Sequence, residues 1–189
     1  MVYADGVIKH VGVLAVGGDH VSNDLAYGLK LPLGRAEQLK LEHGAAVVAA
    51  ADKGQTLTLA SDLGLPEKTI NLEHLRRIMT LRLEEIFELI EHDLAQAGLL
   101  DYLRAGVFIS GGGARIPQVQ QLAERVFRLP ACLGKANSIS GLKSALDQPE
   151  FATAIGLVKY ASFQRKQTGG GSRWKRGLKS TLGTLFKRG

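Results

Sequence analysis

The 189-residue sequence has little cysteine, no long apolar run and no grouping of metal-ligating side chains. Cys132 is its single cysteine, which excludes an internal disulfide framework and a thiolate metal cluster and favours a reducing cytoplasm. No stretch reaches the roughly 18 consecutive apolar residues of a membrane span, and the N-terminus has no basic region followed by an apolar run. We therefore expect a protein that is neither exported nor threaded through a bilayer.

Catalytic constellations are also missing. The five histidines, His10, His20, His43, His74 and His92, show no metal-ligand spacing. No serine or cysteine stands near a histidine and a carboxylate in a way that indicates a nucleophilic triad. The sequence therefore predicts no catalytic residues and no metal site.

What is present indicates an ordinary globular protein, with 45% hydrophobic and 22% charged residues and a mean hydropathy of +0.02. Its formal net charge of +6 is confined to one end. Residues 169–189 contain six basic residues and no acid, which leaves 18 basic against 18 acidic residues in the remainder. Since a nucleic-acid-binding domain carries basic residues over a folded face, we expect no nucleic-acid partner.

The order of the predicted elements indicates an α/β fold. Strand patterns occur at Val2–Ala4 and Val7–Leu14 (a hairpin around Asp5-Gly6), 45–50, 56–59, 106–109 and 131–134. Helical patterns occur at 22–27, 33–43, 72–97, 116–127 and 151–160. The longest helix has Asn71 as its N-cap and Gly98 as its stop signal, and Pro117 is expected in the first turn of the fourth.

Two features have a structural and a functional interpretation. Gly111, Gly112 and Gly113 stand where a strand passes into a helix, a place where backbone N–H groups can bind an anion, although a plain strand-to-helix turn looks the same. The spacing matches neither a dinucleotide fingerprint nor a P-loop. Glu37 and Lys40 share one helix face, where they could bond a ribose and an adenine edge or form only a solvated ion pair.

The C-terminal segment follows the flexible sequence Thr168–Ser172 and predicts a basic amphipathic helix. All of its large apolar residues fall within an arc of about 120°, namely Trp174, Leu178, Leu182, Leu185 and Phe186. Basic residues occupy much of the remaining circumference, among them Arg173, Arg176 and Lys179, while Lys175 interrupts the apolar face and would have to snorkel. The pattern is typical of an in-plane anchor on anionic lipid; a helix for a partner's groove and a solvated tail are the alternatives.

Several segments together resemble the FtsA family, which belongs to the actin-like superfamily and acts in bacterial cell division. The matching segments are Asp5–His10, Val16–Leu29, Ala36–Lys40, Arg82–Ile86, Ser110–Ala114, Ala154–Leu157 and the C-terminal amphipathic helix. The resemblance covers essentially the whole chain. The chain departs from the family in one respect. The family has an Asp-Ile-Gly-Gly-Gly-Thr phosphate loop just before the segment matching Tyr3–His10, and an entire first half before that loop. The 189-residue sequence contains neither.

The resemblance therefore implies an incomplete actin-like (ribonuclease-H-like) second lobe, as a truncated gene model or a split gene would each produce. It implies a large subdomain at 1–18 and 98–163, a small subdomain at 19–97, a flexible linker at 164–172 and a membrane-targeting helix at 173–189. By resemblance, Gly111, Gly112 and Gly113 contact the adenosine of ATP, with Glu37 and Lys40 at the base and ribose. The full-length family binds ATP with Mg²⁺ and has at most slow ATPase activity.

This chain lacks the phosphate loops, so we expect it to bind ATP weakly or not at all and not to hydrolyse it. The implied function is to anchor the FtsZ ring at the cytoplasmic face of the inner membrane as a peripheral protein. Implied partners are the FtsZ C-terminal peptide, with Arg76, Arg77 and Arg82 as candidate contacts, and further copies in actin-like filaments of the full-length family. The alternatives are a lobe of a sugar kinase, a heat-shock chaperone or another actin-like ATPase, and a pilus-assembly ATPase-like protein.

Overall fold

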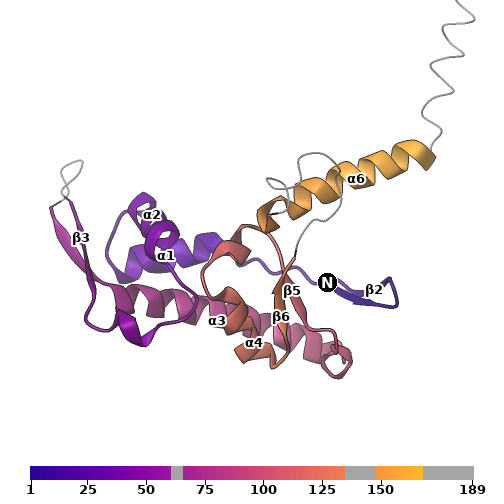
Figure 1. Ribbon diagram of the computed structural model, residues 1–189, viewed down its shortest axis with the longest axis horizontal. Coiled ribbons are helices and arrows are strands. Elements are labelled where there is room, and N and C mark those ends of the chain that lie inside the picture. The colour runs from indigo at the N-terminus through magenta and orange to yellow at the C-terminus, as the bar shows by residue number, and fades with distance from the viewer. Residues whose placement is uncertain (61–65, 135–147, 168–189) are drawn as a thin grey trace, which may run out of the picture.

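A computed structural model describes residues 1–60, 66–134 and 148–167, and element labels follow Figure 1. The strands are β1 (Val2–Ala4), β2 (Val7–His10), β3 (Thr56–Leu59), β4 (Lys68–Asn71), β5 (Val107–Ile109) and β6 (Ala131–Leu133). The α-helices are α1 (Gly18–Gly28), α2 (Leu33–His43), α3 (Leu72–Gln96), α4 (Val119–Phe127) and α6 (Ala152–Gln167). Short 3₁₀ turns are η1 (Ala50–Asp52), η2 (Leu100–Tyr102), η3 (Gly112–Arg115) and η4 (Pro149–Phe151).

The described strands pair two by two. β1 and β2 form an antiparallel hairpin, as do β3 and β4, whereas β5 and β6 run parallel. The predicted hairpin at the N-terminus is confirmed, although β2 ends at His10 rather than at Leu14.

Helix α3 is the longest helix of the described residues, and α1 and α4 pack against it (Figure 1). The Asn71 side chain accepts a hydrogen bond of 2.9 Å from the His74 N–H, which satisfies one free donor of the first turn. The helix ends just before Gly98, whose φ of +66° an L-residue rarely adopts. The predicted N-cap, length and stop signal are all confirmed.

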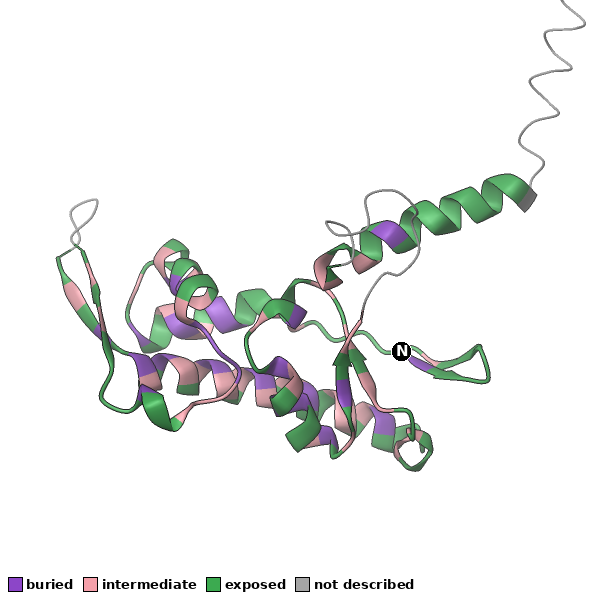
Figure 2. Ribbon diagram, in the orientation of Figure 1, coloured by how far each residue is buried: buried purple, intermediate pink, exposed green. Residues whose placement is uncertain are grey.

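The core lies on the inner faces of the helices. α1 packs on both α2 and α3, and α4 packs farther along α3, where the Phe87 and Phe127 rings are 5.6 Å apart. The largest fully buried side chains are Val21, Leu25, Leu75, Met79 and Leu122. In Figure 2, buried residues follow these contacts, whereas α6 is almost entirely exposed. One hydrophobic cluster therefore joins helices from both predicted subdomains.

The strand predicted at 45–50 is wrong. Instead, Ala45 and Ala46 are buried in an irregular segment that leads into η1, and the Ala46 N–H donates to the Pro117 carbonyl at 2.9 Å. The Asp52 carboxylate accepts a hydrogen bond from the Ala49 N–H at 2.8 Å. In a strand, the N–H groups of Ala46 and Ala49 would bond to a neighbouring strand. Here they bond instead to the Pro117 carbonyl and the Asp52 carboxylate.

Three further elements differ from the predicted ones. The strand β4 was not predicted, and it pairs with the predicted strand β3. α4 begins at Val119 because Gln118 has a φ of +62°, which places Pro117 before the helix rather than in its first turn. α6 continues to Gln167 and so includes residues 164–167 of the predicted linker.

The remaining linker at 168–172 and the predicted membrane helix at 173–189 lie outside the described residues. In the described part of the chain, no helix is both long and apolar enough to span a bilayer.

Candidate functional site

The glycine turn joins β5 to η3 and is held in place by η4. Gly111 has a φ of +93°, and its N–H donates to the Pro149 carbonyl at 2.8 Å. An ion pair of 2.8 Å between Arg115 and Glu150 holds the same two segments together. Gly111 is therefore required by the backbone conformation itself.

Gly112 and Gly113 do not have a positive φ, so their backbone conformation does not require glycine. A Cβ added to either one, or to Gly111, would meet no heavy atom within 4 Å, so packing does not demand a glycine there. The turn opens outward and leaves room for a ligand to approach the backbone. A cavity of about 410 Å³ lies beside it, lined by residues 114–120 with Leu133, Gln148 and Pro149.

Glu37 and Lys40 form a compact polar cluster with Ser22, a buried residue of α1. The Lys40 Nζ lies 2.6 Å from the Glu37 carboxylate and donates to the Ser22 hydroxyl at 2.8 Å. The Ser22 hydroxyl in turn donates to Glu37. The hydrogen bond from Lys40 is the main cause that lowers the pKa of Glu37, and the bond from Ser22 adds to it. The pair is thus part of a fixed arrangement between two helices and not only a solvated ion pair.

The predicted adenosine contacts fall into two groups. Among the described hydrogen bonds, none joins Glu37 or Lys40 to the glycine turn. The hydrogen bond between Ala46 and Pro117 connects the segment that follows α2 with the segment that follows η3.

Sequence reasoning missed Ser22 as a member of the polar cluster, because no local pattern marks a residue 15 positions from the carboxylate that it contacts.

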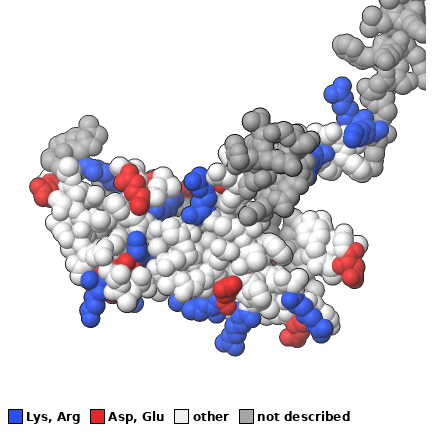
Figure 3. All heavy atoms as spheres, in the orientation of Figure 1, with Lys and Arg blue, Asp and Glu red and all other residues white. Residues whose placement is uncertain are grey.

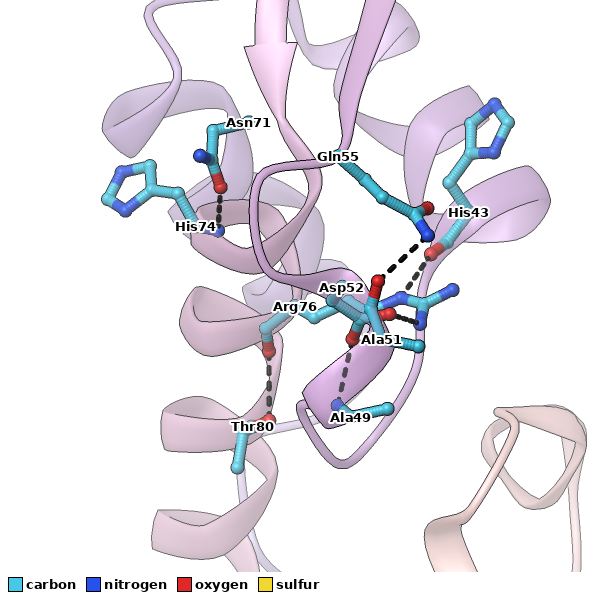
Figure 4. Close-up of polar contacts among 9 residues, drawn as sticks. All are labelled: His43, Ala49, Ala51, Asp52, Gln55, Asn71, His74, Arg76 and Thr80. Carbon is cyan, nitrogen blue, oxygen red and sulfur yellow. Dashed lines mark hydrogen bonds and ion pairs between the residues drawn. The ribbon is translucent and has the colours of Figure 1, made fainter.

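Arg76 lies inside a network of internal contacts (Figure 4). Its guanidinium donates to the His43 carbonyl at 3.1 Å and to the buried Asp52 carboxylate at 2.6 Å. Burial alone would raise the pKa of Asp52, but the hydrogen bonds from Arg76 and the Ala49 N–H outweigh burial and lower that pKa. Asp52 therefore stays ionised, and Arg76 holds η1 against α3.

Arg82 connects α3 to α1. It donates to both oxygens of Asp24, at 2.5 and 3.1 Å, and lies 2.6 Å from Glu85 on its own helix. The hydrogen bond to Asp24 raises the pKa of Arg82, so the guanidinium stays charged. Arg77 differs, since its side chain is 63% exposed and its partner Glu73 is 3.8 Å away.

The described surface mixes both signs of charge. On the face in Figure 3, Lys and Arg side chains lie among Asp and Glu side chains, as the balanced composition of this part of the chain predicts. Residues 1–60, 66–134 and 148–167 contain no group of three or more His, Cys, Asp or Glu that could hold a metal ion.

Solved structures with a similar fold include two of MreB5 from Spiroplasma citri, one bound to ADP and one bound to AMPPNP. Their TM-scores are 0.63 and 0.64 at 21% and 20% identity, over 84% of this chain and 48% and 47% of those chains. The chain therefore has an α/β fold that resembles a part of the actin-like MreB fold.

Curated relatives are FtsA proteins. The chain is 30% identical to cell division protein FtsA of Pseudomonas aeruginosa over 159 residues, which are 84% of this chain and 38% of that protein. It is 27% identical to FtsA of Escherichia coli K12 over 194 aligned positions, 99% of this chain and 46% of that protein. The chain thus spans less than half the length of these relatives.

The family model for cell division protein FtsA matches residues 1–156, most of the chain. This match favours FtsA over the kinase, chaperone and pilus-assembly alternatives. The chain belongs to the FtsA family of cell division proteins.

Proposed function

We propose that the chain links FtsZ to the cytoplasmic face of the membrane as a peripheral protein. The observation that carries the proposal is the combination of an FtsA match over residues 1–156 with a basic amphipathic sequence behind it. The alignment with the Escherichia coli protein extends over 99% of this chain. A folded body that binds a protein and a segment that binds lipid are the two parts that a tether needs.

The proposed contacts for FtsZ are Arg76, Arg77 and Arg82 of α3, and the ligand is the FtsZ C-terminal peptide with its acidic side chains. Arg77 offers its charge most freely because of its exposure. Arg82 and Arg76 already satisfy internal carboxylates, so a peptide carboxylate would share them with Asp24 or Asp52. Such sharing is chemically possible, since a guanidinium has five donors.

Flotation of anionic vesicles tests this function directly. A labelled FtsZ C-terminal peptide is expected to float only when the 189-residue chain is present, and Arg82→Glu is expected to reduce the floated peptide at least about fivefold. The matched control is Asp24→Asn, which breaks the same α1–α3 ion pair but leaves Arg82 free to bind. If both variants lose the peptide equally, the effect is structural and the Arg82 assignment is wrong; peptide that floats without the chain contradicts the tether.

For the nucleotide, we propose that the Ser22–Glu37–Lys40 cluster and the glycine turn meet the adenosine end of ATP. Support comes from MreB5, which was solved with ADP and with AMPPNP, and from the outward-facing glycines of this chain. The contacts that we propose for this chain are with the nucleoside, since the phosphate loops of the family lie in the part that the chain does not span. Self-association into actin-like filaments is proposed only for chains of the family's full length.

The chain is therefore expected to bind ATP only weakly. Contacts to adenosine without contacts to the phosphates lose the charge-assisted hydrogen bonds that make phosphate binding strong. Isothermal titration calorimetry should detect no binding at micromolar ATP. At ligand concentrations high enough to detect the weak binding, adenosine and ATP should give similar heats. Micromolar affinity for ATP together with much weaker adenosine binding would refute the assignment, because it would require phosphate contacts within these residues.

A further inference from the structure

Lys40 has all of its hydrogen-bonding capacity committed within the chain. Its Nζ lies 2.6 Å from Glu37 Oε2, donates to the Ser22 hydroxyl at 2.8 Å and donates to the Gly18 carbonyl at 3.2 Å. An ammonium group has three donors and no acceptor, so these three partners occupy it completely. The Lys40 side chain is also only 10% exposed. Lys40 therefore keeps no donor for a ligand.

Glu37 differs from Lys40 in both respects. Its side chain is 40% exposed, and Lys40 and Ser22 bond to the same carboxylate oxygen, Oε2. Among the contacts of residues 1–60, 66–134 and 148–167, none involves the other oxygen, Oε1. A carboxylate oxygen can accept two hydrogen bonds. Oε1 is therefore an acceptor that a ligand can reach.

Ser22 and Lys40 together fix the orientation of this carboxylate. Ser22 is a buried residue of α1, whereas Glu37 and Lys40 belong to α2. Two donors on Oε2 hold the carboxylate against both helices and direct Oε1 away from them. The hydrogen bonds from Lys40 and then from Ser22 lower the pKa of Glu37, so the carboxylate is ionised at neutral pH.

The cavity beside the glycine turn suits a different part of a nucleoside. Most of its lining is apolar or uncharged, and includes Ile116, Pro117, Leu133 and Pro149. Such a surface fits a planar base, whereas the hydroxyl groups of a ribose need polar partners. The Pro117 carbonyl also accepts the hydrogen bond from Ala46, in the segment that follows α2. The chain that leaves the helix of Glu37 and Lys40 thus meets the wall of this cavity.

We propose that Glu37 Oε1 accepts a hydrogen bond from a ribose hydroxyl, and that Lys40 and Ser22 are positioning residues with no ligand contact of their own. The assignment rests on the nucleoside site proposed above and gives that site a selectivity for the sugar. A hydrogen bond to a carboxylate is stronger than a neutral one. A nucleoside without hydroxyls at C2′ and C3′ leaves Oε1 unpaired and is expected to bind less tightly.

Titrations of the 189-residue chain with adenosine and with 2′,3′-dideoxyadenosine, followed by NMR, test the selectivity. We expect the dissociation constant of dideoxyadenosine to be at least about fivefold higher. Glu37→Gln should remove most of this preference, because the donors Lys40 and Ser22 select the amide oxygen and turn the NH₂ group toward the ligand. Equal dissociation constants for the wild-type chain would overturn the role of Glu37 but not the nucleoside site. Binding of neither nucleoside would overturn both.

A double-mutant cycle separates positioning from contact. Lys40→Met should weaken adenosine binding about fivefold, leave dideoxyadenosine binding unchanged, and have no further effect in a chain that carries Glu37→Gln. Ser22→Ala should give the same pattern with a smaller loss, and it serves as the second variant if Lys40→Met does not fold. Additive losses in the double variant, or equal losses for the two nucleosides, would indicate direct contact by Lys40 and overturn the assignment.

The carboxyl group of Glu37 provides a readout without ligand. In a ¹³C NMR titration, Lys40→Met and Ser22→Ala should each raise the pKa of Glu37 toward its ordinary value of 4.5, with the larger change from Lys40→Met. Gln38→Met is the matched control, since Gln38 is an exposed residue of the same helix that bonds to Glu42 at 3.0 Å. It should change neither the pKa nor the nucleoside preference. An unchanged pKa in both cluster variants, or equal loss of preference in Gln38→Met, contradicts the positioning role.

Discussion

Trp174→Glu and Leu182→Glu are each expected to release the chain from anionic vesicles, whereas Thr184→Glu is expected to leave most of it bound. The first two changes place a carboxylate inside the apolar arc of the predicted C-terminal helix, and the third places it outside. All three change the net charge by the same amount. Sedimentation with vesicles therefore separates insertion of an apolar face from attraction by charge.

The expected size of the effect follows from the two contributions to binding. About sixteen helical residues would lie some 24 Å along the bilayer surface, with five large apolar side chains at the acyl boundary. Six basic residues add roughly 1 kcal/mol each near anionic lipid, an upper limit of about 6 kcal/mol before the helix is ordered. Since Gly177 and Gly183 each cost about 1 kcal/mol in a helix, the segment needs a surface on which to fold.

Lipid composition and salt provide the controls. Neutral vesicles should bind much less of the wild-type chain than anionic vesicles do, and high salt should weaken binding by screening. Equal release by all three substitutions would show that charge alone governs attachment, and the amphipathic-helix interpretation would then fail.

Asp52→Ala is expected to lower the free energy of unfolding by about 3 kcal/mol at neutral pH. The change leaves the guanidinium of Arg76, a residue of α3, without its buried partner in η1, and loss of one member of a buried ion pair is strongly destabilising. It also removes the acceptor for the Ala49 N–H. Urea unfolding followed by circular dichroism measures the difference.

The effect of Asp52→Ala should depend on pH in a defined direction. The pKa of Asp52 is lower in the folded chain than its ordinary value of 3.8. Its stabilisation is therefore fully present above pH 3.8 and is lost as the pH falls through the folded-state pKa. The difference between the wild-type and variant chains should shrink in acid below pH 3.8.

The control for this prediction is Glu84→Ala. Glu84 pairs with Arg125 across α3 and α4 at 3.3 Å, but this pair is exposed to solvent. Exposed pairs contribute about 0.2–1 kcal/mol, so a much smaller loss of stability is expected. Comparable losses in the two variants, or a difference for Asp52 that is unchanged in acid, would contradict the buried-pair account.

The sequence alone was sufficient for features that depend on neighbouring residues. The bounds of α3 follow from an N-cap, a helical repeat of apolar residues and a glycine stop, all of which act within a few positions. The same holds for the hairpin around Asp5-Gly6 and for the turn at Gly111, where a left-handed backbone conformation favours glycine. The family resemblance also rested on short runs of this kind.

Only the tertiary structure decided the contacts between distant residues. Arg82 meets Asp24 across 58 positions, and Arg76 meets Asp52 across 24, so no periodic pattern could pair them. The segment 45–50 looked like a strand because its residues are small and apolar, but the contact with Pro117 and the turn at Asp52 place it in an irregular path. Local propensity is worth a few tenths of a kcal/mol per residue, whereas burial and pairing of a whole segment are worth several, so the packed chain determines such choices.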